Sequence, residues 1–217
     1  LSFLTVMTPS GRLYEVDTRL RPNGRAGALV SSVGAFREYQ IKEAWTWELQ
    51  ALTRARFIAG SPSVAGHFKR IRQEVLCQPR DAGALAAELL EMRRRMSREH
   101  DAGVHADAAA APKHQPGGLV DIEFVVQYLV LAHAHDHPRL TGNLGNIALL
   151  GIAGEIGLVP ADLAARVADA YREYRKVQHA IRLTGAPHVR VDPAAHAQRR
   201  NDVDALWTAV FGGAWRE

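Results

Sequence analysis

The sequence predicts an α+β fold in which helices dominate. We expect residues 1–34 to form part of a β-sheet domain and residues 35–217 to form a helical bundle. Two observations predict this division. Residues 13–21 alternate apolar and polar side chains with the two-residue period of a strand. From residue 35 onward, apolar residues recur instead at the three- and four-residue spacing of amphipathic helices.

The predicted strand at 13–21 carries its charged side chains on one face. Alternation places Glu15, Asp17, Arg19 and Arg21 together, opposite an apolar face. Acids beside arginines suit metal-assisted phosphoryl transfer, in which a carboxylate holds Mg²⁺ or takes a proton and guanidinium groups contact phosphate oxygens. The same arrangement is also typical of a solvated edge strand with ion pairs between its side chains. Spacing alone leaves both interpretations open.

The helical part is predicted to begin with one long helix over residues 35–59, in which Trp45 and Trp47 are expected to be core aromatics. A helix beginning near Asp81 should place the arginines at 93–95 mainly in solvent. The most apolar helix is expected at 119–134. Further helices are predicted at 146–156, 160–184 and 197–212.

Asp121 and Glu123 follow a Gly-Gly turn at the start of the most apolar predicted helix. Residues two apart on a helix lie about 200° apart around its axis, so both carboxylates cannot face one ion if the first turn is regular. Asp121 is also well placed to stabilise the helix N-terminus through the helix dipole. A site-facing role and a structural role therefore both remain open.

Composition limits the class of protein. The net charge is +4 with a pI near 9.5, but no dense run of lysine and arginine predicts a nucleic-acid-binding arm. No apolar run approaches the roughly 20 residues of a membrane-spanning helix. Cys77 is the single cysteine, which excludes an internal disulfide framework. A reducing, cytoplasmic location is the expectation that fits this usage.

Several stretches resemble the family of glutamine-synthetase adenylyltransferases, bifunctional bacterial enzymes that add AMP to glutamine synthetase and remove it. They are Gly11 to Pro22, Ala35-Phe36 with Tyr39-Gln40, Ala44 to Glu48 with Gln50 to Leu52 and Arg54 to Arg56, and Gly117 to Phe124 with Gln127 to Leu131. These stretches occur in the family's order across most of the chain. Residues 14–18 and 44–48 are similar to the C-terminal, adenylylating half.

The resemblance implies a polymerase-β-like nucleotidyltransferase that moves AMP from ATP to a tyrosine of glutamine synthetase and so regulates nitrogen assimilation. Asp17 matches the third carboxylate of a site for two Mg²⁺ ions, which makes it the expected catalytic and metal-binding residue. Arg19 and Arg21 would be nucleotide-binding. Glu15, Asp121 and Glu123 are candidates to face the site.

The chain also departs from the family pattern. The family's Gly-Ser turn and Asp-x-Asp pair do not precede Asp17. The sequence is therefore expected to be a piece of the transferase truncated on its N-terminal side, and to be inactive alone. A different interpretation is a helical regulatory module that binds proteins and recruits glutamine synthetase or a PII-type signal protein, with catalysis elsewhere in the polypeptide.

Overall fold

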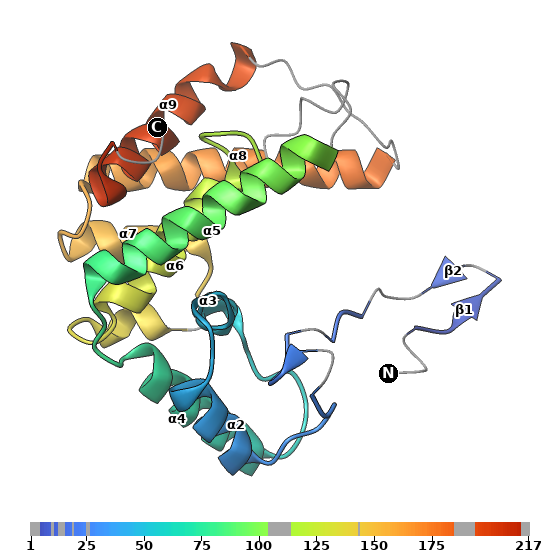
Figure 1. Cartoon of the computed structure of the whole chain (residues 1–217). Helices are drawn as coiled ribbons and strands as arrows, with labels where there is room; N and C mark the ends of the chain where they lie inside the picture. The colour runs from blue at the N-terminus through green and yellow to red at the C-terminus, as the bar shows by residue number, and fades with distance from the viewer. Residues whose placement is uncertain are drawn as a thin grey trace.

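The computed structural model describes residues 5–9, 11–12, 16–18, 20–24, 27–103, 114–142, 144–184 and 194–213. Within these ranges the chain is mostly helical. Its only strands there are β1 (Met7–Thr8) and β2 (Gly11–Arg12), which pair antiparallel with Met7 opposite Arg12. Figure 1 shows this small hairpin standing away from the helices that form the body of the protein.

The predicted piece of nucleotidyltransferase sheet is not present in the described residues. Val16, Asp17 and Thr18 have no regular secondary structure and join no ladder. A strand is stabilised by neighbouring strands and by packing one face against a core, and a hairpin of two residues on each side supplies neither. The α+β prediction is therefore correct only in its helical part. Residues 13–15 and 19 of the predicted strand lie outside the described residues.

The first helices are α2 (Val33–Lys42), α3 (Thr46–Arg54) and α4 (Pro62–Leu76). The single helix predicted over 35–59 is wrong, because the chain turns between α2 and α3. The carbonyl of Tyr39 accepts from the backbone N–H groups of both Glu43 and Ala44, which ends α2. The Glu48 carboxylate accepts from the backbone N–H of Trp45 at 2.9 Å, an N-terminal cap that starts α3.

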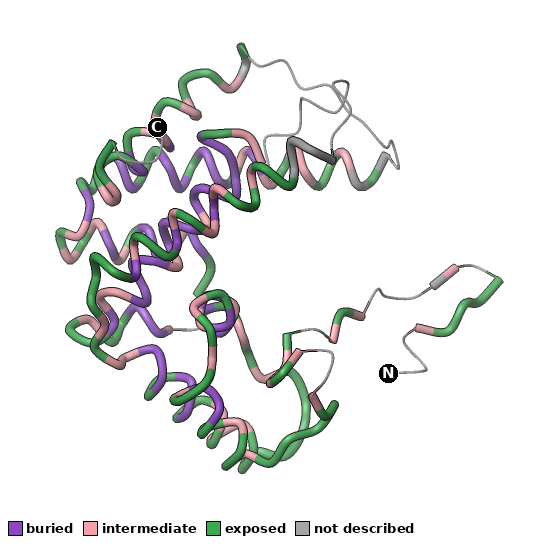
Figure 2. The backbone as a smooth tube through the Cα atoms, in the orientation of Figure 1, coloured by how far each residue is buried: buried purple, intermediate pink, exposed green. Residues whose placement is uncertain are grey.

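The remaining helices surround α6 (Leu119–His133), whose side chains are mostly buried. Around it pack α3, α5 (Ala82–Gly103), α7 (Asn146–Glu155), α8 (Ala161–Thr184) and α9 (Ala197–Phe211), with the short 3-10 helices η3 (Pro138–Thr141) and η4 (Ala194–His196) between them. Figure 2 shows the buried residues gathered in this part, whereas the N-terminal segment is largely exposed. The helix predicted at 119–134 is confirmed, and it ends at His133.

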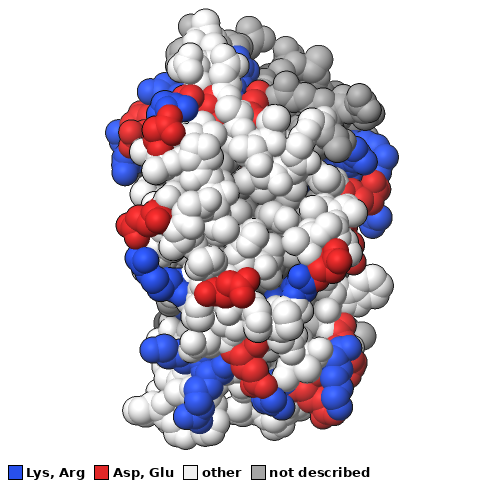
Figure 3. Space-filling view, turned by 90° about the vertical axis from the view of Figure 1, so that its left-hand side faces the viewer, with Lys and Arg blue, Asp and Glu red and all other residues white. Residues whose placement is uncertain are grey.

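The surface of the helical body varies in character. Figure 3 views the side of the molecule where α7 lies, and charged side chains are found mainly around the margins of a broad uncharged area.

Trp45 and Trp47 were expected in the core, but they are 71% and 39% exposed because they lie at the start of α3, before its buried face. No helix in the described part of the chain combines the length and apolar character of a membrane span.

Candidate functional site

Asp17, the expected catalytic carboxylate, lies exposed in the irregular segment 16–18. In the sequence, a turn over residues 20–24 lies between this segment and α2. Arg21 is half-buried in this turn. Glu15 and Arg19, the other predicted site residues of this segment, lie outside the described residues. Asp17 thus lies in the sequence between the β1–β2 hairpin and the turn that precedes α2.

The turn is closed by the side chain of Arg21. Its Nη1 donates to the Thr18 carbonyl at 2.8 Å and its Nε donates to the Gly27 carbonyl at 3.1 Å. A Cβ on Gly27 would lie 1.9 Å from the Pro22 carbonyl oxygen, so only glycine fits there. Arg21 therefore holds both arms of the turn together. Its predicted contact with a nucleotide stays a prediction.

A buried Tyr39–Glu48 pair anchors the turn to the helices. The Tyr39 hydroxyl, on α2, lies 2.8 and 2.9 Å from the two carboxylate oxygens of Glu48 on α3. A backbone hydrogen bond from Asn23 in the turn also reaches Tyr39, whose pKa is raised chiefly by burial. The segment that carries Asp17 is consequently fixed to the α2–α3 junction.

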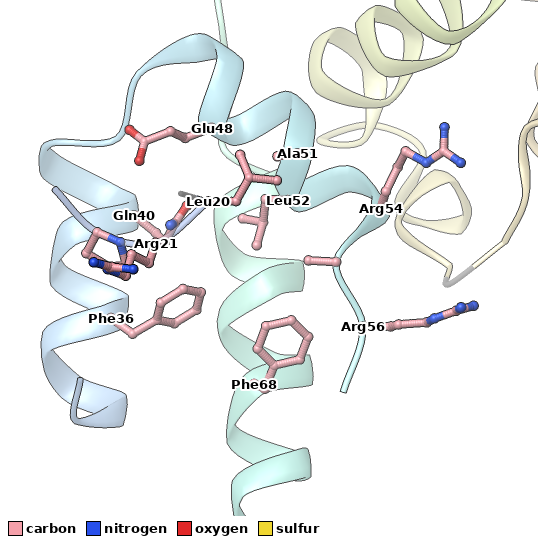
Figure 4. Close-up of a pocket in the computed structure, with 12 residues that line it drawn as sticks. Leu20, Arg21, Phe36, Gln40, Glu48, Ala51, Leu52, Arg54, Arg56 and Phe68 are labelled. Atoms are coloured by element: carbon pink, nitrogen blue, oxygen red, sulfur yellow. The ribbon is translucent and has the colours of Figure 1, made fainter. Parts of the chain in front are cut away.

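A cavity of about 500 Å³ lies where the turn meets α2, α3 and α4 (Figure 4). Its apolar wall includes Phe36 and Phe68, whose ring centroids are 6.0 Å apart. Gln40 also lines it; this side chain is buried, and its Oε1 accepts no hydrogen bond from the described residues. Arg54 and Arg56 point away from the two phenyl rings. The cavity is thus mainly apolar, with the buried polar side chains of Gln40 and Glu48 in its lining and cations at its margin.

Asp121 and Glu123 occupy different surroundings in the first turns of α6. Asp121 is buried; its Oδ1 accepts from the Nε of Arg93 at 2.6 Å and its Oδ2 from the Gly117 N–H at 2.7 Å. Burial raises the pKa of Asp121, while Arg93 and the Gly117 N–H oppose that rise. Arg93 was expected in solvent, but it is fully buried because this carboxylate compensates its charge.

Glu123 is half-buried and lies nearer the cavity beneath the turn. It accepts from Arg54 Nη1 at 2.9 Å and from the Tyr171 hydroxyl at 3.2 Å. Arg54 lines that cavity, so Glu123 is linked to it through an ion pair. The structure therefore separates the two acids, as the angular spacing on a helix requires.

Sequence reasoning missed several residues that build this region. Glu48 carried a usable signal, since an acid three residues after a helix start is typical of a capping box. Tyr39 and Gln40 carried no such signal in the sequence, apart from belonging to one of the stretches that resemble the family. Arg93 is the first of three consecutive arginines, Arg93 to Arg95. Apolar periodicity does not reveal which of the three contacts a buried acid.

Mg²⁺ takes six oxygen ligands, usually one or two carboxylates together with waters and substrate phosphates. Asp17 offers one exposed carboxylate, which fits a contribution to such a site. Across the described ranges, no three acidic, histidine or cysteine side chains gather as a metal-binding group. The described residues alone therefore do not form a complete metal site.

Comparisons with known proteins identify the class. Residues 1–71 match the family model described as glutamate-ammonia ligase adenylyltransferase, and residues 83–187 match the one described as GlnD PII-uridylyltransferase. Both descriptions name nucleotidyltransferases, the class that the family resemblance of the sequence implied.

Curated relatives specify the family further. The chain is 56% identical to the bifunctional glutamine synthetase adenylyltransferase/adenylyl-removing enzyme of Aromatoleum aromaticum over 98% of its length, and 52% identical to that of Bordetella bronchiseptica over 97%. The Nitrosomonas europaea enzyme is 49% identical over 97% of the chain. The chain belongs to this enzyme family. It spans 22%, 22% and 24% of these three relatives, respectively.

Proposed function

We propose that the chain is part of a glutamine synthetase adenylyltransferase and belongs to the half that transfers AMP from ATP to a tyrosine of glutamine synthetase. Residues 1–34 would be the end of its catalytic domain, and residues 35–217 the adjoining helical domain. The observation that carries the proposal is the exposed Asp17 carboxylate within the 71 residues that match the adenylyltransferase family model. Support also comes from the relatives, which are bifunctional glutamine synthetase adenylyltransferase/adenylyl-removing enzymes.

In the proposed reaction, the tyrosine oxygen forms a bond to the α-phosphorus of ATP while the bond to the pyrophosphate leaving group breaks. Asp17 orients the tyrosine hydroxyl and accepts its proton directly or through a water molecule. Bound Mg²⁺, for which Asp17 would be one ligand, supplies electrostatic stabilisation of the attacking and leaving oxygens. Arg21 and the Tyr39–Glu48 pair keep the Asp17 segment in place. Since the described residues provide one carboxylate for the metal, we expect the 217-residue chain alone to be inactive.

The test is Asp17→Asn in the longer polypeptide that contains this chain. We expect transfer of labelled AMP to glutamine synthetase to fall by about a thousandfold, because a metal-binding carboxylate is worth several kcal/mol at the transition state. The matched control is Asp169→Asn, an exposed acid on α8 paired with Arg172. It should retain full transfer. Unchanged transfer in the Asp17 variant would remove the assignment.

Addition and removal of AMP must be measured separately in the same variants. If Asp17→Asn abolished removal while leaving addition intact, the chain would belong to the other half of the bifunctional enzyme. Binding of glutamine synthetase, followed in the absence of ATP, should be the same in both variants if the role of Asp17 is chemical.

The second candidate is a helical module that recruits glutamine synthetase or a PII-type signal protein. It is favoured by the match of residues 83–187, within the helical body, to a family named for PII uridylylation. This interpretation requires the 217-residue chain to bind one of these proteins without ATP. Absence of binding to both proteins at micromolar concentrations would contradict it.

A further inference from the structure

A second cavity, of about 520 Å³, adjoins the first, and Ala55, Arg56 and Phe68 line both. It is formed by the segment after α3, by α4 and by η3. Four cations line it: Arg56, Lys69, Arg72 and Arg139. No acidic residue is found among its described lining residues, so the lining has a strongly positive character.

The deepest of these cations is a fixed part of the wall. Arg72 is buried, and its Nε donates to the Leu52 carbonyl at 3.0 Å, while its other nitrogens donate to the carbonyls of Thr53 and Thr141. These three acceptors are neutral. The guanidinium stays protonated in proteins, so it adds a positive charge that no carboxylate in the described ranges cancels. Its three bonds also make this part of the cavity rigid.

Two further cations are available to a ligand. Arg56 and Lys69 are exposed, and in the described part of the chain neither forms an ion pair or a side-chain hydrogen bond. Arg139 differs, because its Nη2 donates to Glu155 at 2.8 Å. A guanidinium and an ammonium group together suit a compact anion with several oxygens, which the planar fork of arginine can contact at two points.

Apart from the polar side chains of Gln73 and Thr141, the rest of the lining is apolar. Phe57, Phe68 and Pro138 provide surface that favours an organic group over a hydrated inorganic ion. From this combination we propose that the cavity binds a small phosphorylated organic molecule. Arg56 and Lys69 contact the phosphate oxygens, Arg72 strengthens the local positive potential, and the apolar side receives the organic part. The site is separate from Asp17 and does not depend on the transferase proposal.

The proposal is tested by titrating the 217-residue chain separately with phenyl phosphate, inorganic phosphate and phenol. Calorimetry measures the binding of each compound. Phenyl phosphate should bind most tightly, inorganic phosphate more weakly, and phenol hardly at all. Arg56→Gln and Lys69→Gln should each weaken phenyl phosphate binding by about tenfold, the effect of losing one charge-assisted hydrogen bond. Added salt should weaken binding as well.

Matched controls are Arg98→Gln on α5 and Lys176→Gln on α8, exposed cations that pair with Glu91 and Glu173 away from the cavity. Both should bind phenyl phosphate like the unaltered chain. The proposal is overturned if the Arg56→Gln/Lys69→Gln double variant binds normally, if phenol competes as well as phenyl phosphate, or if neither phosphate compound binds at millimolar concentration. Binding of single-stranded RNA without any binding of phenyl phosphate would also overturn it, since the surface would then recognise a polyanion.

Discussion

Arg93 and Asp121 form an ion pair inside the protein, with Arg93 Nε 2.6 Å from Asp121 Oδ1 and neither side chain more than 2% exposed. Arg93 Nη2 also donates to the His114 carbonyl at 2.9 Å, and the second oxygen of Asp121 accepts from Gly117. The pair therefore joins α5 to α6 and to the turn that precedes α6.

Removing one partner of this pair should be strongly destabilising. Arg93→Met leaves the Asp121 carboxylate buried without its cation, and we expect the free energy of unfolding to fall by about 3–5 kcal/mol. Urea denaturation measures the change. Arg98→Gln, which breaks an exposed pair with Glu91 on the same helix, should cost less than about 1 kcal/mol. Equal effects of the two substitutions would show that the buried pair is not needed for stability.

Gly117 should not tolerate a side chain. Its φ is +73°, and an added Cβ would lie 3.0 Å from both the carbonyl oxygen and the Cβ of Arg200. Gly117→Ala is therefore expected to destabilise the protein by about 1–3 kcal/mol in thermal or urea unfolding. Gly151→Ala is the matched control, because Gly151 is exposed within α7 and an added Cβ meets nothing within 4 Å. This control should stabilise the helix by about 0.5–1 kcal/mol.

Tyr39→Phe should loosen the turn that carries Asp17. The substitution removes the hydroxyl that contacts Glu48 and the backbone of Asn23, leaving a buried carboxylate with fewer donors. We expect faster hydrogen exchange at the amides of Gly24 and Gly27, which donate to the carbonyls of Arg21 and Asn23. Tyr128→Phe, whose hydroxyl lies 3.4 Å from the Ala82 carbonyl, should leave both amides unchanged. Unaltered exchange in the Tyr39 variant would contradict the anchoring role.

Tyr174 predicts a loss of stability in alkaline solution. Burial raises its pKa from 10.0 to about 12, and its hydroxyl donates to the Gly117 carbonyl at 3.1 Å. Because the folded pKa lies above the unfolded one, the contribution of Tyr174 to stability is complete below pH 10 and is lost as the pH rises to about 12. Unfolding free energies measured below and within this interval should show the decline.

The matched variant for that measurement is Tyr174→Phe. It should be less stable by about 1 kcal/mol below pH 10, since the Gly117 carbonyl loses its donor. Its decline between pH 10 and 12 should be shallower than that of the unaltered protein. An equally steep decline would assign the alkaline transition to other groups.

The helical body could be predicted because its apolar residues repeat at helical spacing, and the strongest run became the central helix α6. The break between α2 and α3 was missed because apolar periodicity continues across it; the cap formed by Glu48 decides the boundary. The strand predicted at 13–21 is absent from its described residues, 16–18 and 20–21, for a different reason. Alternating apolar and polar residues form a stable strand only when neighbouring strands pair with it. The described residues provide only a short hairpin of two residues on each side.

The site could be predicted only in part. The Asp17 segment was found from its residue types and its resemblance to a family, and its catalytic role stays a prediction. The burial of Arg93 could not be predicted, because it depends on an acid 28 residues away in the sequence. The same holds for the cavity cations, since Arg56 and Arg139 come together only through the packing of η3 against α4.

The hydrogen bonds of Arg72 impose an order on the folding of this chain. Two of its acceptors, Leu52 and Thr53, precede it by 20 and 19 residues, whereas Thr141 follows it by 69. A ribosome synthesising the protein therefore releases α4 well before the last acceptor exists. Until Thr141 has left the ribosome, water must solvate one edge of the guanidinium. The α3–α4 region can therefore exclude water and pack fully only late in translation.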